Sequence, residues 1–260
     1  MKISVVIPAF NEEKYLAACL QSLKEQTEKP DEIIVVDNNS TDNTAGIARS
    51  FGARVVNEKI QGMIPARNLG FDEARYDIIA RTDADTYLPK NWLKQIKNAF
   101  QDNSLFAYSG PATWYKVPKT LQPFNWQTRI WFEPFKAVFG HDCLFGPNMA
   151  LRKSAWELVR NEVCLKDSIV HEDMDLAYHI GKYGKIKFDP KHVIMMSPRR
   201  WKKVYPYILY GYRNIRTIQH HRDTILQLHK RKEMVKKVLP KTKRTIKKVA
   251  QTVRHPFRYL

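Results

Sequence analysis

The first 56 residues alternate apolar segments with segments of helical periodicity, and this order restricts the folds open to the chain. Short apolar runs typical of buried strands occupy Ile3–Ile7, Glu32–Val36 and Arg54–Val56. Two predicted helices separate these runs, the first with Asn11 as its N-cap and the second ending at Gly52. Strands joined through helices in this way pair in parallel. The sequence therefore predicts an α/β fold with a mostly parallel sheet flanked by helices.

Two acidic residues follow the next predicted strand, Asp77–Thr82. Asp83 and Asp85 stand two positions apart with Ala84 between them, so both carboxylates can point to one side, where they repel each other unless a cation binds. Ligands of open α/β sheets bind at the carboxyl ends of strands, and Mn²⁺ or Mg²⁺ prefers oxygen ligands. Such an ion would also hold a diphosphate and stabilise it as a leaving group. A pair of solvated loop residues is the simpler alternative for this tripeptide taken alone.

The middle of the chain continues the α/β pattern and then becomes aromatic. Helices are predicted at Pro65–Ala74, Lys90–Phe100, Ser154–Arg160 and Glu172–Tyr183, and strands at Leu105–Gly110, Asn148–Leu151, Lys185–Phe188 and His192–Met196. Between Trp114 and Phe139 aromatic residues are frequent and prolines interrupt them. These rings could stack on sugar rings or cover a lipid, although aromatic residues at this density more often belong to a core.

Asp173 faces the apolar side of its predicted helix. The residues three, four and seven positions later are Leu176, Ala177 and Ile180, which share its face. Acidic residues are common in the first turn of a helix because they complement the helix dipole, and this accounts for Glu172 better than for Asp173. An inward carboxylate at this position indicates a functional role.

Six short motifs resemble those of the family 2 glycosyltransferases with the GT-A fold. They are Val6–Glu12, Val35–Asp42, Gly62 with Ala66–Gly70, Arg81–Asp85, Gly146–Ala150 and His171–Leu176. Each motif is weak alone, but together they follow the family's order and approximate spacing over roughly residues 1–200. The resemblance implies a nucleotide-sugar donor, with UDP as the first candidate, and an inverting transfer by single displacement.

The resemblance also implies a role for each matching residue. It places the nucleoside against Pro8, Ala9, Phe10 and Glu12 with the base at Asp37, puts Arg67 on the nucleotide side, and puts the ribose and the metal-bound diphosphate at Asp83, Ala84 and Asp85. It makes Asp173 the base that takes the proton of the acceptor hydroxyl, which requires an ionised carboxylate near neutral pH, as the helix N-terminus favours. It places the acceptor or the donor sugar near Glu172, Asn148 and Trp114. Asp37 as a turn residue and Arg67 as a surface charge are equally good interpretations.

The end of the matching region departs from the family. Many relatives carry a histidine metal ligand on the strand after the catalytic helix, whereas here Met195–Pro198 occupies that region and His192 comes earlier. Arg199 and Arg200, followed by Trp201, resemble in part an Arg-Trp element of processive relatives. One of these arginines could cover the diphosphate, or both could simply begin the basic segment that follows.

Residues 199–260 hold almost all of the net charge. They carry 19 Lys and Arg against two acidic residues, which accounts for +17 of the total of +18, whereas residues 1–198 carry 25 basic and 24 acidic residues. This predicts a GT-A domain at 1–198 and a basic segment at 199–260. Apolar positions between Val235 and Val253 keep helical spacing opposite lysines and arginines, which is typical of a helix on an anionic membrane surface. Nucleic-acid binding is less favoured, because no recognisable nucleic-acid module accompanies the charge, and docking on a partner protein is the other alternative.

Together these features predict a transferase that moves a sugar from a nucleotide diphosphate to a hydroxyl or phosphate of a glycan or lipid-linked acceptor. No apolar run reaches the length of about 18 residues that a membrane-spanning helix needs. The three cysteines form no close pair and fit a reducing compartment. We therefore expect a cytoplasmic protein, peripheral on the inner face of the cell membrane. The alternative is a catalytically inert or nucleic-acid-binding protein built on the same fold.

Overall fold

The structure, a computed structural model, describes residues 1–115, 117, 122, 132–166, 169–200 and 205–221. The chain divides into two units, Met1–Thr217 and Ile218–Leu260, and the first of them holds both sheets. The helix predicted between Val235 and Val253 lies outside the described residues. Within the described part of the chain, no helix combines the length and the apolar character needed to cross a membrane.

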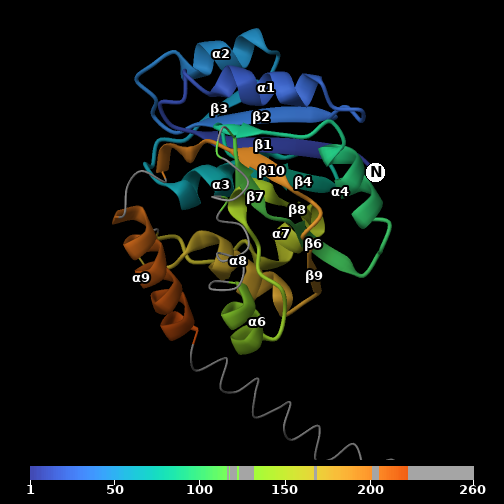
Figure 1. Cartoon of the computed structure of the whole chain (residues 1–260), viewed down its shortest axis with the longest axis vertical. Coiled ribbons are helices and arrows are strands. Elements are labelled where there is room, and N and C mark those ends of the chain that lie inside the picture. Colours follow the sequence, from blue (N-terminus) through green and yellow to red (C-terminus); the bar gives the residue numbers. More distant parts are fainter. Residues whose placement is uncertain (116, 118–121, 123–131, 167–168, 201–204, 222–260) are drawn as a thin grey trace, which may run out of the picture. The chain divides into compact units, whose positions relative to one another are not determined.

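A seven-stranded sheet forms the centre of the first unit (Figure 1), with the strand order β3-β2-β1-β4-β8-β6-β9. Its strands are β1 (Ile3–Ala9), β2 (Glu32–Asp37), β3 (Arg54–Asn57), β4 (Ile78–Arg81), β6 (Leu105–Ser109), β8 (Met149–Arg152) and β9 (Lys185–Phe188). β1 pairs in parallel with β2 and β4, and β2 with β3, which confirms the predicted parallel sheet. β8 runs antiparallel to both of its neighbours, β4 and β6, whereas β6 and β9 are parallel.

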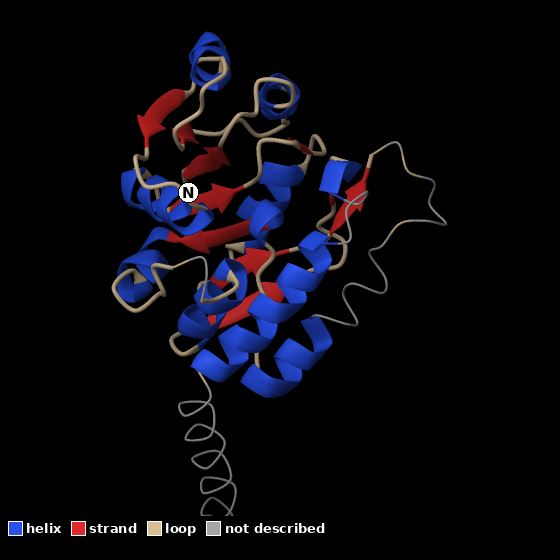
Figure 2. Cartoon of the chain, turned by 90° about the vertical axis from the view of Figure 1, so that its left-hand side faces the viewer, coloured by secondary structure: helices blue, strands red, loops and turns tan. Residues whose placement is uncertain are grey.

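Helices surround the strands of this sheet (Figure 2). They are α1 (Leu16–Lys24), α2 (Thr44–Ser50), α3 (Met63–Glu73), α4 (Trp92–Ala99), α6 (Glu133–Phe139), α7 (Lys153–Val159), α8 (Glu172–Gly181) and α9 (Tyr205–His220). The chain crosses the sheet in one direction from β1 to β3 and then returns to β4. Right-handed crossovers therefore place α1 and α2 on one face of the sheet and α3 on the other.

The two faces of β1 pack against different helices, because successive side chains of a strand point in opposite directions. The odd-numbered residues from Ile3 to Ile7 join α1 and α4 in the main apolar core. On the other face, Gly70 of α3 lies against Val6 and Val36, and a Cβ at Gly70 would come within 2.3 Å of Val6 Cγ1. The lack of a side chain at Gly70 therefore allows α3 to pack closely on β1 and β2.

A small three-stranded sheet begins directly after Asp85, with the strand β5. It consists of β5 (Thr86–Tyr87), β10 (Ile194–Met196) and β7 (Ala112–Trp114), with β10 in the middle. Just after β10, Ser197 N donates a hydrogen bond to the carbonyl oxygen of Asp85 at 3.2 Å. The short 3-10 helix η4 (Pro198–Arg200) follows, in which the side chain of Arg200 lies outside the description. These contacts bring the start of the basic segment to the acidic pair.

The N-cap prediction for Asn11 was wrong. α1 begins at Leu16, after Tyr15, and Asn11 has a left-handed backbone with a φ of 53°, a conformation that asparagine adopts more readily than most residues. Its Oδ1 accepts a hydrogen bond from Thr41 N at 2.8 Å. Asn11 therefore ties the loop after β1 to the loop after β2 and does not cap a helix.

Candidate active site

A pocket of about 320 Å³ lies at the carboxyl ends of β1 and β4. It is lined by Pro8, Ala9, Phe10, Glu12, Asn38, Gln61, Gly62, Met63, Ala66, Asp83, Ala84 and Arg199. Six of these residues were predicted to contact the nucleotide part of a donor, and Arg199 to contact its diphosphate. The fold brings them together at the edge of the sheet where open α/β sheets bind their ligands.

The acidic pair is buried at this pocket, and Asp85 shares the guanidinium of Arg199 with Glu12. Asp83 and Asp85 are 8% and 4% exposed. Arg199 Nε lies 2.8 Å from Asp85 Oδ2, and Arg199 Nη1 donates to Glu12 Oε2 at 2.8 Å. The same guanidinium lies over the ring of Tyr15. Arg199 thus supplies a positive charge at the carboxylate where the sequence predicts a metal ion.

The side-chain oxygens of the acidic pair fit a hard divalent cation, because carboxylates are the ligands that Mn²⁺ and Mg²⁺ prefer. The contact of Asp85 with Arg199 shows that positive charge is favourable at this position. The thiols of Cys19 and Cys143 do not compete for such chemistry. Both are buried, and burial raises the pKa of each well above its usual value.

Asn38 holds the loop of residues 58–62, which forms another side of the pocket. Asn38 was not identified as a site residue from the sequence. Its Oδ1 accepts hydrogen bonds from Gly62 N at 2.9 Å and Gln61 Nε2 at 3.3 Å. Its Nδ2 donates to the carbonyl oxygens of Glu58 at 3.1 Å and Ile60 at 2.7 Å. The amide therefore fixes the loop that leads into α3. An asparagine directly after a buried strand was the signal that could have identified it.

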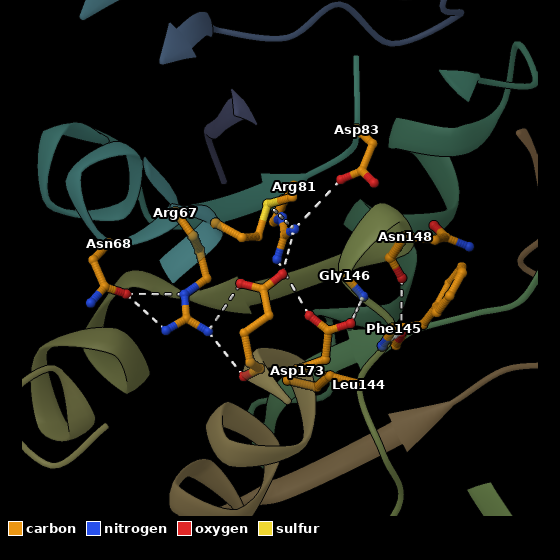
Figure 3. Close-up of polar contacts among 12 residues, drawn as sticks. Arg67, Asn68, Arg81, Asp83, Leu144, Phe145, Gly146, Asn148 and Asp173 are labelled. Atoms are coloured by element: carbon orange, nitrogen blue, oxygen red, sulfur yellow. Dashed lines mark hydrogen bonds and ion pairs between the residues drawn. The ribbon is translucent and has the colours of Figure 1, made fainter. Parts of the chain in front are cut away.

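A cluster of buried charges lies next to Asp83 (Figure 3). Arg81, the last residue of β4, is 1% exposed. Its Nη2 lies 2.7 Å from Glu172 Oε1 and 3.5 Å from Asp83 Oδ1, and its Nη1 lies 3.4 Å from Asp173 Oδ1. Arg67 of α3 reaches the same helix end, with Nη1 3.0 Å from the carbonyl oxygen of Glu172 and 3.6 Å from Glu172 Oε2. The cluster joins β4, α3 and the first turn of α8.

Opposite charges compensate one another inside this cluster. Burial alone would lower the pKa of Arg81, but the carboxylates of Glu172, Asp83 and Asp173 raise it above its usual value. Burial raises the pKa of Glu172, but Arg81 and Arg67 outweigh that effect and lower it overall. Arg81 and Glu172 therefore form a buried pair in which both groups are charged.

Asp173 is buried, as its helical position predicted, but its pKa differs from the expectation. Gly146 N donates to Asp173 Oδ2 at 2.7 Å, and Arg81 contacts Oδ1. Burial and the charge of Glu172 outweigh these contacts and raise the pKa of Asp173 to about 8. The prediction that the helix N-terminus keeps Asp173 ionised at neutral pH was therefore wrong. A carboxyl group with a pKa near 8 can take up or release a proton close to neutral pH.

Gly146 allows the carboxylate of Asp173 to approach the backbone. A Cβ at Gly146 would lie 2.6 Å and 2.9 Å from the two carboxylate oxygens of Asp173 and 3.0 Å from Arg81 Nη1. Gly146 begins the 3-10 helix η3 (Gly146–Asn148), which leads into β8. Because β8 is antiparallel to β4, with Met149 opposite Arg81, the start of β8 lies at the carboxyl end of β4.

Asn148 and His192 lie in the core. Asn148 is fully buried, its Oδ1 accepts from Trp92 Nε1 at 2.8 Å, and its Nδ2 donates to the carbonyl oxygens of His192 at 2.6 Å and Pro111 at 3.2 Å. His192 Nδ1 lies 2.7 Å from Gln95 Oε1, its ring stacks on Trp92, and burial lowers its pKa to about 4. Both ends of the Asn148 amide are therefore used in holding the core together, and His192 belongs to the same core.

Three further predicted residues are not among the described residues that line the pocket. Asp37 ends β2, and its Oδ1 accepts a hydrogen bond from Ser40 N at 3.2 Å. Arg67 is fully buried against Glu172, so its interpretation as a surface charge was wrong. Trp114 ends β7 at the edge of the small sheet.

A parallel sheet with a pocket at the ends of β1 and β4, an acidic pair after β4 and a buried aspartate at the start of α8 define a protein of the GT-A class. Residues 4–158 match the sequence profile of Glycosyl transferase family 2. The chain belongs to this family.

A curated protein and a solved structure are similar to this chain. EpsH of Bacillus subtilis strain 168, named as a candidate glycosyltransferase, is 28% identical over 196 residues, which are 70% of this chain and 56% of that protein. The mannosyltransferase PcManGT of Pyrobaculum calidifontis, solved with GDP-Man and Mn²⁺, matches with a TM-score of 0.67 at 20% identity over 84% of this chain and 63% of that chain.

A second solved structure has the same fold. Glucosyl-3-phosphoglycerate synthase of Mycobacterium tuberculosis, in complex with Mn²⁺, UDP and phosphoglyceric acid, matches with a TM-score of 0.60 at 18% identity over 84% of this chain and 77% of that chain. At these identities the two structures show a shared fold. The chain spans a little over half the length of EpsH.

Proposed function

We propose that this protein is an inverting glycosyltransferase that moves a sugar from a nucleotide diphosphate to a hydroxyl or phosphate of a glycan or lipid-linked acceptor. The observation that supports this most directly is the proximity of a pocket of about 320 Å³ to a buried acid–base group. Asp83 lines the pocket, Asp173 has a pKa of about 8, and Arg81 contacts both. A pocket beside a carboxyl group that titrates near neutral pH is the arrangement expected of an enzyme site.

The donor would occupy the pocket with its nucleoside against Pro8, Ala9 and Phe10 at the end of β1. We take UDP as the first candidate, with Asp37 as the proposed contact of the base. A Mn²⁺ or Mg²⁺ ion held by Asp83 and Asp85 would bind the diphosphate and stabilise the charge that develops on it as it leaves. PcManGT and the mycobacterial synthase were solved with Mn²⁺ and with GDP-Man or UDP, which fits this proposal.

Arg199 would change partners when the donor and the cation bind. Its contacts with Asp85 and Glu12 hold it at the pocket before binding. A divalent cation at Asp85 would repel the guanidinium, and the diphosphate would attract it. Arg199 would then cover the diphosphate, the role proposed for it and for Arg200.

The transfer would be a single displacement at the anomeric carbon. The acceptor oxygen attacks this carbon, the bond to the diphosphate breaks, and the hydroxyl proton passes to Asp173. A group with a pKa of about 8 is ionised in about one molecule in ten at pH 7. Proton uptake by Asp173 would therefore become more effective as the pH rises toward 8. Glu172, paired with Arg81 and Arg67, would support this helix end.

The acceptor is proposed to be presented at a membrane surface on the cytoplasmic face of the cell membrane. The +17 charge of residues 199–260 supports this, because each Lys or Arg near an anionic bilayer contributes about 1 kcal/mol to binding. Flotation of the full chain with vesicles containing phosphatidylglycerol should be lost at high salt. Equal flotation with neutral vesicles would contradict an electrostatic contact, and tighter binding to duplex DNA would favour the nucleic-acid alternative.

Thermal unfolding with UDP or GDP, each with and without Mn²⁺, tests the donor site. We expect one nucleotide to stabilise the wild-type protein only when Mn²⁺ is present, and Asp85→Ala to lose this effect. Asp102→Ala is the matched control, because Asp102 is exposed and pairs with Lys185 outside the pocket. If neither nucleotide raises the melting temperature, the proposal fails and an inert protein on the same fold becomes the better explanation.

A further inference from the structure

Arg81 contacts a carboxylate at the donor pocket and the carboxylate of the proposed base. Its guanidinium lies within 3.5 Å of Asp83, which lines the donor pocket, and within 3.4 Å of Asp173, the proposed base. It is also 2.7 Å from Glu172. We propose that Arg81 is a positioning residue that fixes the carboxylate of Asp173 relative to the donor-side carboxylate of Asp83. This inference rests on the proposed function.

The carboxylate of Asp173 is held at both of its oxygens. Arg81 Nη1 contacts Oδ1 at 3.4 Å, and Gly146 N donates to Oδ2 at 2.7 Å. With one contact alone, the carboxylate could still rotate about the bond that joins it to the side chain. Two contacts fix the direction of the lone pairs that would receive the acceptor proton, and such orientation is a large part of catalysis.

The two buried arginines of the cluster share Glu172 but differ in their other partners. Arg67 donates to the carbonyl oxygen of Glu172 and to Asn68 Oδ1, and it lies 3.6 Å from Glu172 Oε2, so it contacts the backbone and the side chain of Glu172. Arg81 spans from the strand end to the helix, with Asp83 on one side and Asp173 on the other (Figure 3). Charge compensation of Glu172 is thus shared between two arginines, whereas the link between Asp83 and Asp173 is made by Arg81.

The shape of the guanidinium matters for this role. Nη1 and Nη2 point to different carboxylates from one rigid plane, which a single ammonium group cannot do from one position. Burying a guanidinium carries a desolvation cost that ion pairs often only offset, so stability alone gives little reason for an arginine here. Arg81→Lys therefore keeps the positive charge but removes the two separate nitrogen contacts. The variant thus distinguishes positioning of Asp173 from neutralisation of its charge.

The test compares nucleotide release with nucleotide binding. The wild-type protein, Arg81→Lys and Arg81→Gln are assayed for release of nucleotide from UDP-glucose, UDP-N-acetylglucosamine and GDP-mannose with Mn²⁺ and water as acceptor. Calorimetry measures the dissociation constant for UDP or GDP with Mn²⁺. We expect kcat to fall by about 10- to 100-fold in both variants, while the dissociation constant changes by less than about threefold.

Arg54→Lys is the matched control, because Arg54 also bridges two carboxylates, those of Glu32 and Glu73, at the other end of the sheet. Its kcat should equal that of the wild type. The inference is overturned if Arg81→Lys keeps the wild-type kcat, or if the loss of kcat is matched by an equal loss of nucleotide affinity. If Arg81→Gln does not fold, the kcat and the dissociation constant of Arg81→Lys alone test the inference.

A second measurement needs no turnover. The melting temperatures of Arg81→Lys, Asp173→Asn and the double variant form a cycle, in which coupled residues give a combined loss that differs from the sum of the single losses. The pair Arg54→Lys and Asp173→Asn should show additive effects. A wild-type protein that binds neither UDP nor GDP in the presence of Mn²⁺ would contradict the proposed function, whereas additive effects for Arg81 and Asp173 would overturn the positioning role itself.

Discussion

Asp173 keeps its proton in the folded protein at pH values where the unfolded chain has lost it. Its pKa is about 8 in the fold against an ordinary value of 3.8. Between these two values the folded state binds more protons than the unfolded state, so the free energy of unfolding falls as the pH rises. The contribution of Asp173 is fully present below pH 3.8 and is lost as the pH rises through about 8. Asp173→Asn, which cannot titrate, should remove this dependence.

The size of the effect follows from the width of the window. Each pH unit inside it lowers the free energy of unfolding by about 1.4 kcal/mol for one proton. From about pH 5.5 to about pH 7.5, the wild type should therefore lose about 2–3 kcal/mol relative to Asp173→Asn. Asparagine has nearly the size of the protonated carboxyl group and does not titrate, so any change in packing that it causes shifts the variant by an amount that does not depend on pH. His171 and His192, whose pKa values are lowered to about 4 by burial, are present in both proteins and cancel in the comparison.

Urea unfolding followed by circular dichroism at four pH values between about 5.5 and 7.5 measures this difference. Asp102→Asn is the control, because hydrogen bonds from Ser104 and Lys185 lower the pKa of Asp102 to about 2, below the whole window. Its offset from the wild type should be the same at every pH. A constant offset for Asp173→Asn as well would refute the raised pKa and, with it, the account of the buried charge cluster.

Other changes test the remaining parts of the site. With saturating donor, the rate of nucleotide release should rise by about tenfold per pH unit and level off near pH 8, as Asp173 loses its proton. By calorimetry, Arg199→Gln should bind Mn²⁺ alone about 3- to 10-fold more tightly, because a competing cation leaves Asp85, and should bind UDP with Mn²⁺ more weakly. Gly146→Ala should lower the release rate by at least about tenfold without weakening nucleotide binding, since its Cβ displaces the carboxylate of Asp173. Asn148→Ala should lower the free energy of unfolding by about 2–4 kcal/mol in urea, because it leaves buried hydrogen-bonding groups unpaired.

Each of these results has an opposite that would contradict its reasoning. A release rate that does not change between pH 6 and pH 8 would exclude proton uptake by Asp173 as a limiting step. Weaker Mn²⁺ binding by Arg199→Gln would mean that the arginine helps to hold the ion. If Gly146→Ala keeps the wild-type release rate, the carboxylate of Asp173 can move without loss of activity. If Asn148→Ala is as stable as the wild type, a contact of Asn148 with the acceptor becomes the better interpretation.

The first half of the fold could be predicted because its information is local. A strand buried on both faces is a short apolar run, and the predicted strand Ile3–Ile7 is observed as Ile3–Ala9. The wrong assignment of Asn11 has a different cause. Its Oδ1 bonds to Thr41, thirty residues away, and nothing in the sequence around Asn11 distinguishes this contact from a helix cap.

The site was predicted in part for the same reason. Asp83 and Asp85 stand out within a few residues of each other, and the inward position of Asp173 follows from helical periodicity alone. Arg81 was missed although a signal was present. An arginine at the end of the apolar strand Ile78–Arg81 must have a carboxylate partner if the strand is buried, and it stands two residues from Asp83 on the same side.

The contact between Gly146 and Asp173 could not be found from the order of the motifs, because β8 runs against the direction of β4. β8 enters the sheet next to β4 but runs antiparallel to it, with Met149 opposite Arg81. This reversal puts Gly146, just before the start of β8, at the carboxyl end of β4. A parallel strand would have placed its last residue there instead. The amide of Gly146 can then reach Asp173 from one side while Arg81 reaches it from the other. The ends of the parallel strands alone are enough to predict the donor residues. The acid–base group also needs β8, which runs antiparallel to both β4 and β6 and brings Gly146 to Asp173.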